Sequence, residues 1–264
     1  MRIKRLIEGV SAVCYAVYLK AARRGPQRVV LYYHSLRPEN LVSFARQMEY
    51  LADRCQVVRA CEILSAPLAG KKPLVALTFD DAFVSVQEQA VPVLERLGLT
   101  ASIFVPVGLL GSQPKWGLIE QTEDQSEKVM SPEDLRRLQQ KGFDLYSHTM
   151  SHPFLTRLDR PQIRYELEQS RRALEELLGV PVDAVSYPHG DYNRTVLEEA
   201  ERAGYKWGFT IEPRAVFGQT NPLAVGRFSV SPSEGIFSFR LKVLGAYQVC
   251  WGLQKLKKRI LGKR

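Results

Sequence analysis

The chain has 264 residues, of which 45% are hydrophobic and 25% are charged, a composition that is ordinary for a globular protein. This length suits one α/β barrel domain, or at most two small domains, and allows a core without a disulfide scaffold. The four cysteines show no C-x-x-C pair and no zinc-finger spacing, which excludes a cysteine-based zinc module.

The net charge of +9 is concentrated at the two ends of the chain. Residues 1–28 carry +6 and residues 240–264 carry +8, so the remaining residues together carry −5. A nucleic-acid-binding protein is expected to have its basic surface on the fold itself. A mildly acidic body with basic ends therefore argues against nucleic acid as a partner.

Both basic ends have apolar residues at helical spacing, such as Ile3, Ile7 and Val10 near the start. We therefore predict basic amphipathic helices over 1–28 and 236–264, on either side of a barrel domain over 29–235. Such helices either bind peripherally to an anionic membrane or pack on the outside of the barrel, and the pattern leaves both alternatives open.

The N-terminal segment is not typical of a signal peptide, because Glu8 interrupts a short apolar run and no clear cleavage site follows. No stretch of the sequence is long and apolar enough to span a bilayer. We expect a cytoplasmic protein, and the membrane-binding alternative would place it at the inner face of the membrane.

Strand and helix patterns alternate along the central part of the chain. In chain order, the sequence predicts a strand at 29–33, a helix at 41–53, a strand at 74–79, a helix at 84–97, a strand at 101–106, a helix at 132–141, a strand at 143–147, a helix at 161–178, a strand at 182–187, a helix at 194–203 and strands at 205–211 and 224–230. This alternation predicts a parallel sheet covered by helices. About seven strands without a Gly-rich phosphate turn favour a barrel over a doubly wound open sheet.

The four histidines of the chain all lie at or just beyond the ends of predicted strands. His34 follows the first strand, His148 and His152 follow the fourth, and His189 follows the fifth. The carboxyl ends of barrel strands meet at one rim, where active sites of such folds are built. We therefore expect these side chains to converge.

Asp80 and Asp81 directly follow the apolar strand at 74–79. Neighbouring residues at a strand end point in different directions, so one carboxylate can bind a metal while the other faces the substrate as a base. The alternative is that the two acids cap the following helix.

His148 and His152 form an H-x-x-x-H pattern. On a helical turn, residues four apart share a face, so both imidazoles could reach one ion. Two histidines and one carboxylate leave metal positions open for water and substrate, as hydrolytic sites require. We predict a divalent metal, Zn²⁺ first, with Co²⁺, Ni²⁺ or Fe²⁺ as alternatives.

The chain resembles the polysaccharide deacetylase family (the NodB-homology group, carbohydrate esterase family 4) in three motifs: T-F-D-D at 78–81, H-x-x-x-H at 148–152 and Y-P-H-G at 187–190. The resemblance covers about residues 29–230 and includes the Y-H strand end at 33–34, common in the branch linked to exopolysaccharide synthesis. It implies a distorted (β/α)7 barrel. It also implies a hydrolase that removes an N-acyl group, usually acetyl, from amino sugars of a polysaccharide or a lipid-linked glycan.

Carried over to this chain, the resemblance implies that Asp80 is the general base and that Asp81, His148 and His152 are the metal ligands. It also implies that the backbone N–H of His189 helps to hold the oxyanion of the reaction.

The sequence departs from the family pattern in three places. Ser186 stands where many members have an arginine that orients the base, and either Arg227 replaces that arginine or Arg227 forms an ordinary salt bridge. His189 stands where the family usually has tyrosine. No histidine follows His189, so the late histidine that usually serves as general acid is missing.

Another residue must then supply the acid. We hypothesise that His34 does so, with His189 as the second choice; the alternative is that His34 is a structural histidine. We expect the substrate wall to include Tyr187, Pro188, Gly190 and Trp207. For the aromatic side chains, a place in the core is the alternative.

The sequence leaves two other functions open. One is a catalytically inactive barrel that binds a glycan or a synthase, which the departures from the family pattern favour. The other is a metal-dependent amidase with a non-sugar substrate, because fold alone does not decide substrate.

Overall fold

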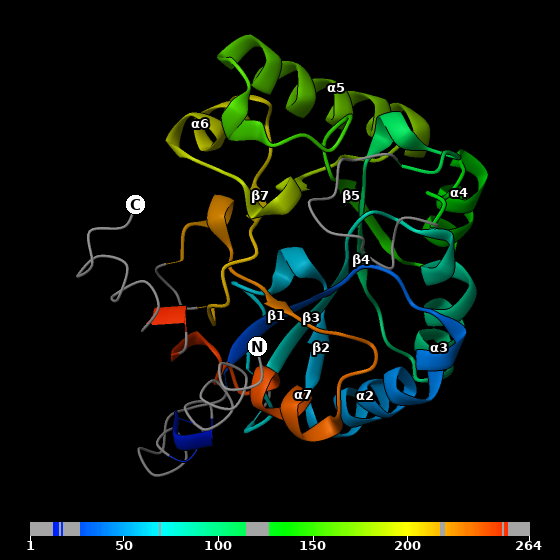
Figure 1. Cartoon of the computed structure of the whole chain (residues 1–264), viewed down its shortest axis with the longest axis vertical. Coiled ribbons are helices and arrows are strands. Elements are labelled where there is room, and N and C mark those ends of the chain that lie inside the picture. Colours follow the sequence, from blue (N-terminus) through cyan, green and yellow to red (C-terminus); the bar gives the residue numbers. More distant parts are fainter. Residues whose placement is uncertain are drawn as a thin grey trace.

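The computed structural model describes residues 13–15, 17, 27–68, 70–114, 127–216, 220–249 and 251–252. Within these residues, a parallel sheet of eight strands curls into a barrel with helices packed around its outside (Figure 1). The α/β barrel expected from the sequence is confirmed. The strands are β1 (Arg28–Tyr33), β2 (Gln56–Val58), β3 (Leu74–Phe79), β4 (Ser102–Val105), β5 (Asp144–Ser147), β6 (Ala184–Ser186), β7 (Trp207–Phe209) and β8 (Phe228–Ser229). The α-helices are α2 (Leu41–Arg54), α3 (Val91–Arg96), α4 (Pro132–Gln140), α5 (Arg160–Leu178), α6 (Arg194–Arg202) and α7 (Ile236–Val243).

The strand order is β7-β6-β5-β4-β3-β1-β8, and β2 pairs with β3 outside this path. β3 pairs with β1 along its whole length. On its other side, the first half of β3 pairs with β2, and only its last two residues, Thr78 and Phe79, pair with β4. The short strand β2 thus fills a gap where β3 and β4 diverge, which distorts the barrel.

The segment from Val225 to Ser229 closes the sheet. Val225 bridges to Phe209 at the end of β7, and Phe228 and Ser229 then pair with β1. Arg227 lies between these two contacts, and its side chain is completely buried. The closing segment therefore carries a buried cation at the seam of the barrel.

The side chains of each strand alternate between two apolar layers, as the pleat requires. On β1, Val29 and Leu31 face the main core between sheet and helices, whereas Val30 faces the barrel interior. Phe104 and Phe209 also fill the interior, with ring centroids 5.3 Å apart. The interior is thus packed rather than open, and polar groups are concentrated at the carboxyl ends of the strands.

The helix predicted at 84–97 is interrupted. Residues Val86–Ala90 form a π-helical turn, and the regular helix α3 begins only at Val91. Pro92, in the first turn of α3, has no N–H to donate to the preceding turn, which explains the break. The sequence also did not predict β2, which is only three residues long and lies between a helix and a 3₁₀ turn.

The structure describes only parts of the two segments that were predicted to form basic helices at the ends of the chain. Residues 1–28 lie almost wholly outside the described residues, and the described part of 236–264 begins with α7. Phe239 and Val243 of α7 are fully buried in the main core, and the Phe239 ring meets Tyr50 of α2 edge-on at 6.1 Å. This part of the C-terminal segment therefore packs on the barrel. In the portion of the chain that the structure covers, no helix has the length and apolar character to cross a membrane.

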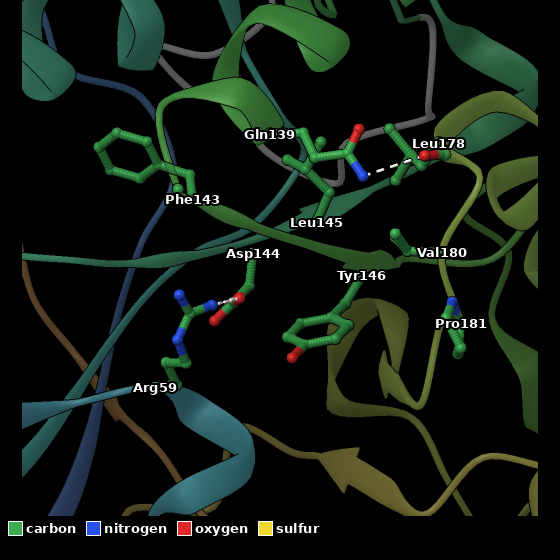
Figure 2. A pocket seen from close by; sticks show the side chains of 10 residues that line it. Arg59, Gln139, Phe143, Asp144, Leu145, Tyr146, Leu178, Val180 and Pro181 are labelled. Carbon is green, nitrogen blue, oxygen red and sulfur yellow. Dashed lines mark hydrogen bonds and ion pairs between the residues drawn. The ribbon is translucent and has the colours of Figure 1, made fainter.

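A cavity of about 240 Å³ lies at the amino-terminal end of the strands (Figure 2). The loops that lead into β5 and β6 line it, together with Arg59, which forms an ion pair with Asp144 at the start of β5. Tyr146 lines it as well. This cavity is at the opposite end of the strands from the predicted site.

Candidate metal and catalytic site

Asp81, His148 and His152 form a buried cluster beyond the ends of β3 and β5. One ligand atom from each residue can be chosen so that all three lie within 4.8 Å of one another. The Nε2 atoms of both histidines are 3.5 Å from Oδ1 of Asp81. Asp81 has a positive φ of 69°, which turns its side chain away from the direction that Asp80 takes. The two adjacent aspartates can therefore have different roles.

The spacing of the two histidines predicted a helical turn, but they do not lie on one. Residues 148–152 form an irregular loop in which Thr149 and His152 have positive φ angles of 67° and 60°. The Thr149 hydroxyl accepts a hydrogen bond from the backbone N–H of His152 at 3.2 Å. The loop turns back on itself and brings the rings together, with centroids 4.8 Å apart.

The protonation of His148 suits it for metal binding. Its Nδ1 lies 2.7 Å from the backbone carbonyl of Ser186, and because a carbonyl can only accept, Nδ1 carries the proton. Nε2, the atom directed at Asp81, is then free to bind a metal. Burial lowers the pKa of His148 to about 4 and also lowers that of His152, so both rings are neutral at neutral pH. Two neutral imidazoles and a carboxylate fit a divalent cation.

Asp80 is clamped by Arg227. The guanidinium donates from Nη1 to Oδ1 and from Nη2 to Oδ2 of Asp80, both at 2.7 Å. Burial alone would raise the pKa of Asp80, but the Arg227 charge, the neighbouring His148 and the hydrogen bonds from Arg227 together hold it below the ordinary value. Asp80 is therefore ionised at neutral pH in spite of being buried.

Further contacts hold Arg227 itself in place. It donates from Nε to the carbonyl of Thr210 at 3.0 Å, and from Nη2 to the Ser186 hydroxyl at 2.7 Å. Its guanidinium also lies over the Tyr32 ring, 4.6 Å from the centroid. Of the two alternatives for Arg227, the structure places it on the predicted base rather than in a surface salt bridge. Ser186 stands at the position where the family pattern has arginine, and its hydroxyl contacts Arg227, which directly precedes β8.

Ser186 has a part in the site that its sequence context did not predict. Its carbonyl fixes His148 and its hydroxyl contacts Arg227, so it connects the metal cluster to the base. Nothing in the local sequence distinguishes this serine from any other buried serine.

His189 lies beside the metal cluster. Its ring stacks on Phe154, with centroids 3.8 Å apart and planes 10° apart, and meets His152 edge-on at 4.6 Å. Burial lowers its pKa. The backbone has positive φ at His189 and Gly190, and a side chain at Gly190 would collide with Ile211. Glycine is therefore required where this turn passes close to the neighbouring loop.

His34 is only partly buried at the end of β1, with its ring edge-on to Tyr32 at 5.6 Å. When protonated, it lowers the pKa of Asp80, His148 and His152. It therefore lies within electrostatic range of both the base and the metal cluster.

Two residues predicted to form the substrate wall do not reach the site. Tyr187 is completely buried in the main core, where its hydroxyl donates to the carbonyl of Leu223 at 2.9 Å. Trp207 begins β7 and packs on the interior cluster, at the strand end away from the metal ligands. Because side chains alternate along a strand, Tyr187 points away from the barrel interior, into the core between sheet and helices. Trp207 is the first residue of β7, so it lies at the amino end of the strand, whereas the site is at the carboxyl ends. Pro188 is buried in the turn that carries His189 and Gly190.

Comparison with known proteins agrees with this site. YxkH of Bacillus subtilis, assigned to the polysaccharide deacetylases, is 29% identical over 227 residues, covering 83% of this chain and 75% of its own. The poly-β-1,6-N-acetyl-D-glucosamine N-deacetylase of Staphylococcus aureus is 25% identical over 181 residues. That match covers 64% of this chain but only 59% of the enzyme.

A solved structure shows the same fold. IcaB of Ammonifex degensii superposes with a TM-score of 0.69 at 26% identity, covering 84% of this chain and 98% of IcaB. The sequence model that describes polysaccharide deacetylases matches residues 68–208, which include β3 and the two aspartates that follow it, the loop with both histidines and the turn at His189. With this match over more than half of its length, the chain belongs to the polysaccharide deacetylase family.

Proposed function

We propose that this protein is a metal-dependent hydrolase that removes the N-acetyl group from amino sugars of a polysaccharide. The observation that carries the proposal is the pair of adjacent aspartates. Asp81 lies with His148 and His152 in a buried cluster, while Asp80 is held separately by Arg227. Such a site would hold a divalent cation beside an ionised carboxylate, which is what amide hydrolysis at neutral pH requires.

In this proposal, Asp81, His148 and His152 hold the metal, and Asp80 is the general base. A divalent cation bound there would act as a Lewis acid, polarising the amide carbonyl and lowering the pKa of a water. Asp80 accepts the proton of that water, and the bidentate contact with Arg227 keeps its oxygens in one orientation. The backbone N–H of His189 provides a donor for the oxyanion that develops.

We assign the general acid to His34. It lies at the rim, it is accessible from solvent, and it is electrostatically coupled to Asp80. His189 is the second choice, because its ring stacks on Phe154, meets His152 edge-on and is less able to turn toward a leaving amine. His34→Ala should lower kcat by about 10² to 10⁴ without loss of bound metal. Full activity of this variant would exclude His34 as the acid.

The substrate class follows from the relatives. The Staphylococcus aureus enzyme acts, by its name, on poly-β-1,6-N-acetyl-D-glucosamine. We propose that the substrate of this protein is a polymer of N-acetylated hexosamine. A lipid-linked amino sugar is the alternative substrate. We propose Zn²⁺ as the metal, since two imidazoles and one carboxylate with open positions are typical of catalytic zinc.

The test combines metal analysis with product release. Wild type and Asp80→Asn are assayed for bound metal and for acetate and formate released from N-acylated hexosamine oligomers, lipid-linked sugars and cyclic amides. Bound metal in both proteins, with acetate released from the oligomers by wild type only, is the expected result. Bound metal with no release by wild type would favour an inactive binding barrel, and release from cyclic amides alone would favour the non-sugar amidase.

We also propose that the protein works at the inner face of the membrane. The basic residues of 240–264 and the exposed side chains of Ile236 and Phe237 support this proposal. Co-sedimentation with vesicles that contain anionic lipid, and not with neutral vesicles, is the expected result. Equal recovery in the supernatant with both vesicles would contradict the proposal.

A further inference from the structure

Glu166 is a buried carboxylate that the proposed reaction does not use. It lies on the face of α5 that packs against the barrel, next to Leu167, and only 7% of it is exposed. Among the residues that the structure describes, no lysine or arginine forms an ion pair with Glu166. A buried carboxylate on an apolar helix face requires hydrogen-bond donors.

Those donors come from the loop that carries the two histidines. One carboxylate oxygen, Oε2, accepts the backbone N–H of Met150 and that of Ser151, both at 2.9 Å. The other oxygen, Oε1, accepts the Ser151 hydroxyl at 2.6 Å. The hydrogen bonds of the Glu166 carboxylate therefore go to Met150 and Ser151, two of the three residues between the predicted metal ligands.

The backbone N–H groups of residues 148–152 each have an acceptor. Three of these acceptors belong to neighbouring strands or to the loop: Val105 O for His148, Ser147 Oγ for Thr149 and Thr149 Oγ1 for His152. The other two N–H groups both depend on Glu166. No other helix residue serves as an acceptor for this stretch of described backbone.

The loop needs such support because its shape is unfavourable. Thr149 and His152 both have positive φ, a conformation that residues other than glycine rarely adopt. His152 is itself a predicted ligand. Strained loops persist only when the surrounding structure holds them. Glu166 contacts the two residues that lie between these strained positions.

We propose that Glu166 is a positioning residue that holds the 148–152 loop in the shape in which His148 and His152 bind the same metal ion. The inference rests on the proposed metal site of Asp81, His148 and His152. Glu166 does not bind the metal; it acts through the backbone between the ligands. Outer residues that orient metal ligands commonly affect metal affinity by about 10- to 100-fold.

The experiment measures the dissociation constant for Zn²⁺ alone, by competition with a chelating indicator, together with the unfolding midpoint of the metal-free protein. Glu166→Met keeps the length of the side chain but removes both acceptors, and should weaken Zn²⁺ binding about 10- to 100-fold. Glu166→Gln keeps one oxygen that can accept both N–H groups, and its amide can donate to Ser151. The glutamine variant should therefore recover most of the affinity.

The matched control is Glu175→Met on the same helix. Glu175 also accepts a backbone N–H, that of Val182 at 3.0 Å, but this contact is remote from the metal cluster. The control should lower the unfolding midpoint of the metal-free protein and leave the Zn²⁺ affinity unchanged. Equal loss of affinity in both methionine variants would show a general stability effect and would overturn the proposal.

If Glu166→Met does not fold, Glu166→Asp replaces it. Aspartate keeps the charge but withdraws the carboxylate by one methylene, so it should bind Zn²⁺ more weakly than the glutamine variant. Wild-type affinity in the aspartate variant would overturn the positioning role. Failure of the wild type itself to bind Zn²⁺, with His152→Ala no different, would instead refute the metal site and with it the proposed function.

Discussion

The two ends of the barrel each contain an arginine–aspartate pair, and the two pairs behave differently. At the carboxyl end, Arg227 and Asp80 are both buried, with side-chain exposures of 0% and 4%, and the pKa of Asp80 is lowered. At the amino end, Arg59 is 46% exposed, and the pKa of Asp144 is raised by its own burial despite the contact. An arginine near an aspartate does not by itself lower the pKa of the aspartate.

The difference lies in how each arginine is held. Arg227 is fixed by Thr210 and Ser186 and presents both terminal nitrogens to Asp80. Arg59 reaches Asp144 from solvent and donates one hydrogen bond to it, so water screens the arginine charge while the aspartate stays partly desolvated. The contacts at the carboxyl end therefore stabilise a buried charge on Asp80. The pair at the amino end lines a cavity and is exposed to solvent on the arginine side.

The largest effect should come from removing the charge of Asp80. Asp80→Asn should lower kcat by about 10² to 10⁴, because it removes the proposed general base, and should retain the metal. Asp144→Asn, at the other end, should leave kcat unchanged. Steady-state kinetics on an N-acetylated oligomer measure both. A comparable loss of kcat in the two variants would mean that the two ends do not differ in the way proposed.

The next largest effect should be on stability. Arg227→Met leaves the Asp80 charge buried without its partner and should cost about 3–5 kcal/mol in the free energy of unfolding. Arg59→Met removes a solvent-screened contact and should cost at most about 1 kcal/mol. Urea unfolding of the metal-free proteins at pH 7 compares them. If the two losses were equal, burial would not explain the difference between the pairs.

A smaller effect is expected at Trp207, which packs at the amino end of β7. Trp207→Leu should lower the free energy of unfolding by about 1–2 kcal/mol, as a partly buried aromatic residue does. It should not change KM for the oligomer, because the side chain is away from the rim. A clear rise in KM with an unchanged free energy of unfolding would show that Trp207 contacts the substrate after all.

The smallest expected effect is in the pH dependence of stability, where the two aspartates should have opposite signs. The lowered pKa of Asp80 stabilises the fold above its unfolded value of 3.8, and this contribution is lost as pH falls through the folded pKa. The raised pKa of Asp144 favours the fold below 3.8, and that contribution is lost as pH rises through its folded pKa.

Urea unfolding between pH 3 and 7 distinguishes these signs. The stability gap between wild type and Asp80→Asn should narrow toward the acid end of the range. Relative to wild type, Asp144→Asn should gain stability as pH rises above 3.8. Parallel curves for wild type and Asp144→Asn would show that Asp144 titrates alike in the folded and unfolded chains.

Much of the fold could be predicted because its signals are local. The strand patterns at 74–79 and 143–147 and the helix pattern at 132–141 depend on near neighbours, and the observed elements agree with them within a few residues. The interruption before α3 and the three-residue strand β2 were missed. Both are too short to show a period, and pairing with β3 is what makes β2 a strand.

The location of the candidate site could also be predicted, but its construction could not. Each of Asp81, His148 and His152 follows a predicted strand, and parallel strands bring their carboxyl ends to one rim. The helical turn assumed for the two histidines was wrong, because the loop shape depends on Glu166 and on residues with positive φ. A spacing of four residues in sequence does not specify a backbone conformation.

The sequence by itself determined which residues could do the chemistry, because strand ends and residue types are encoded within a few positions of one another. Only the tertiary structure decided which arginine holds the base, since Arg227 lies 147 residues from Asp80 and reaches it only when the closing segment joins β1. Likewise, only the folded sheet, through the alternation of faces at Tyr187 and the strand direction at Trp207, places these two residues away from the site. Contacts between distant segments depend on how the whole sheet curls, and no local pattern in the chain specifies that.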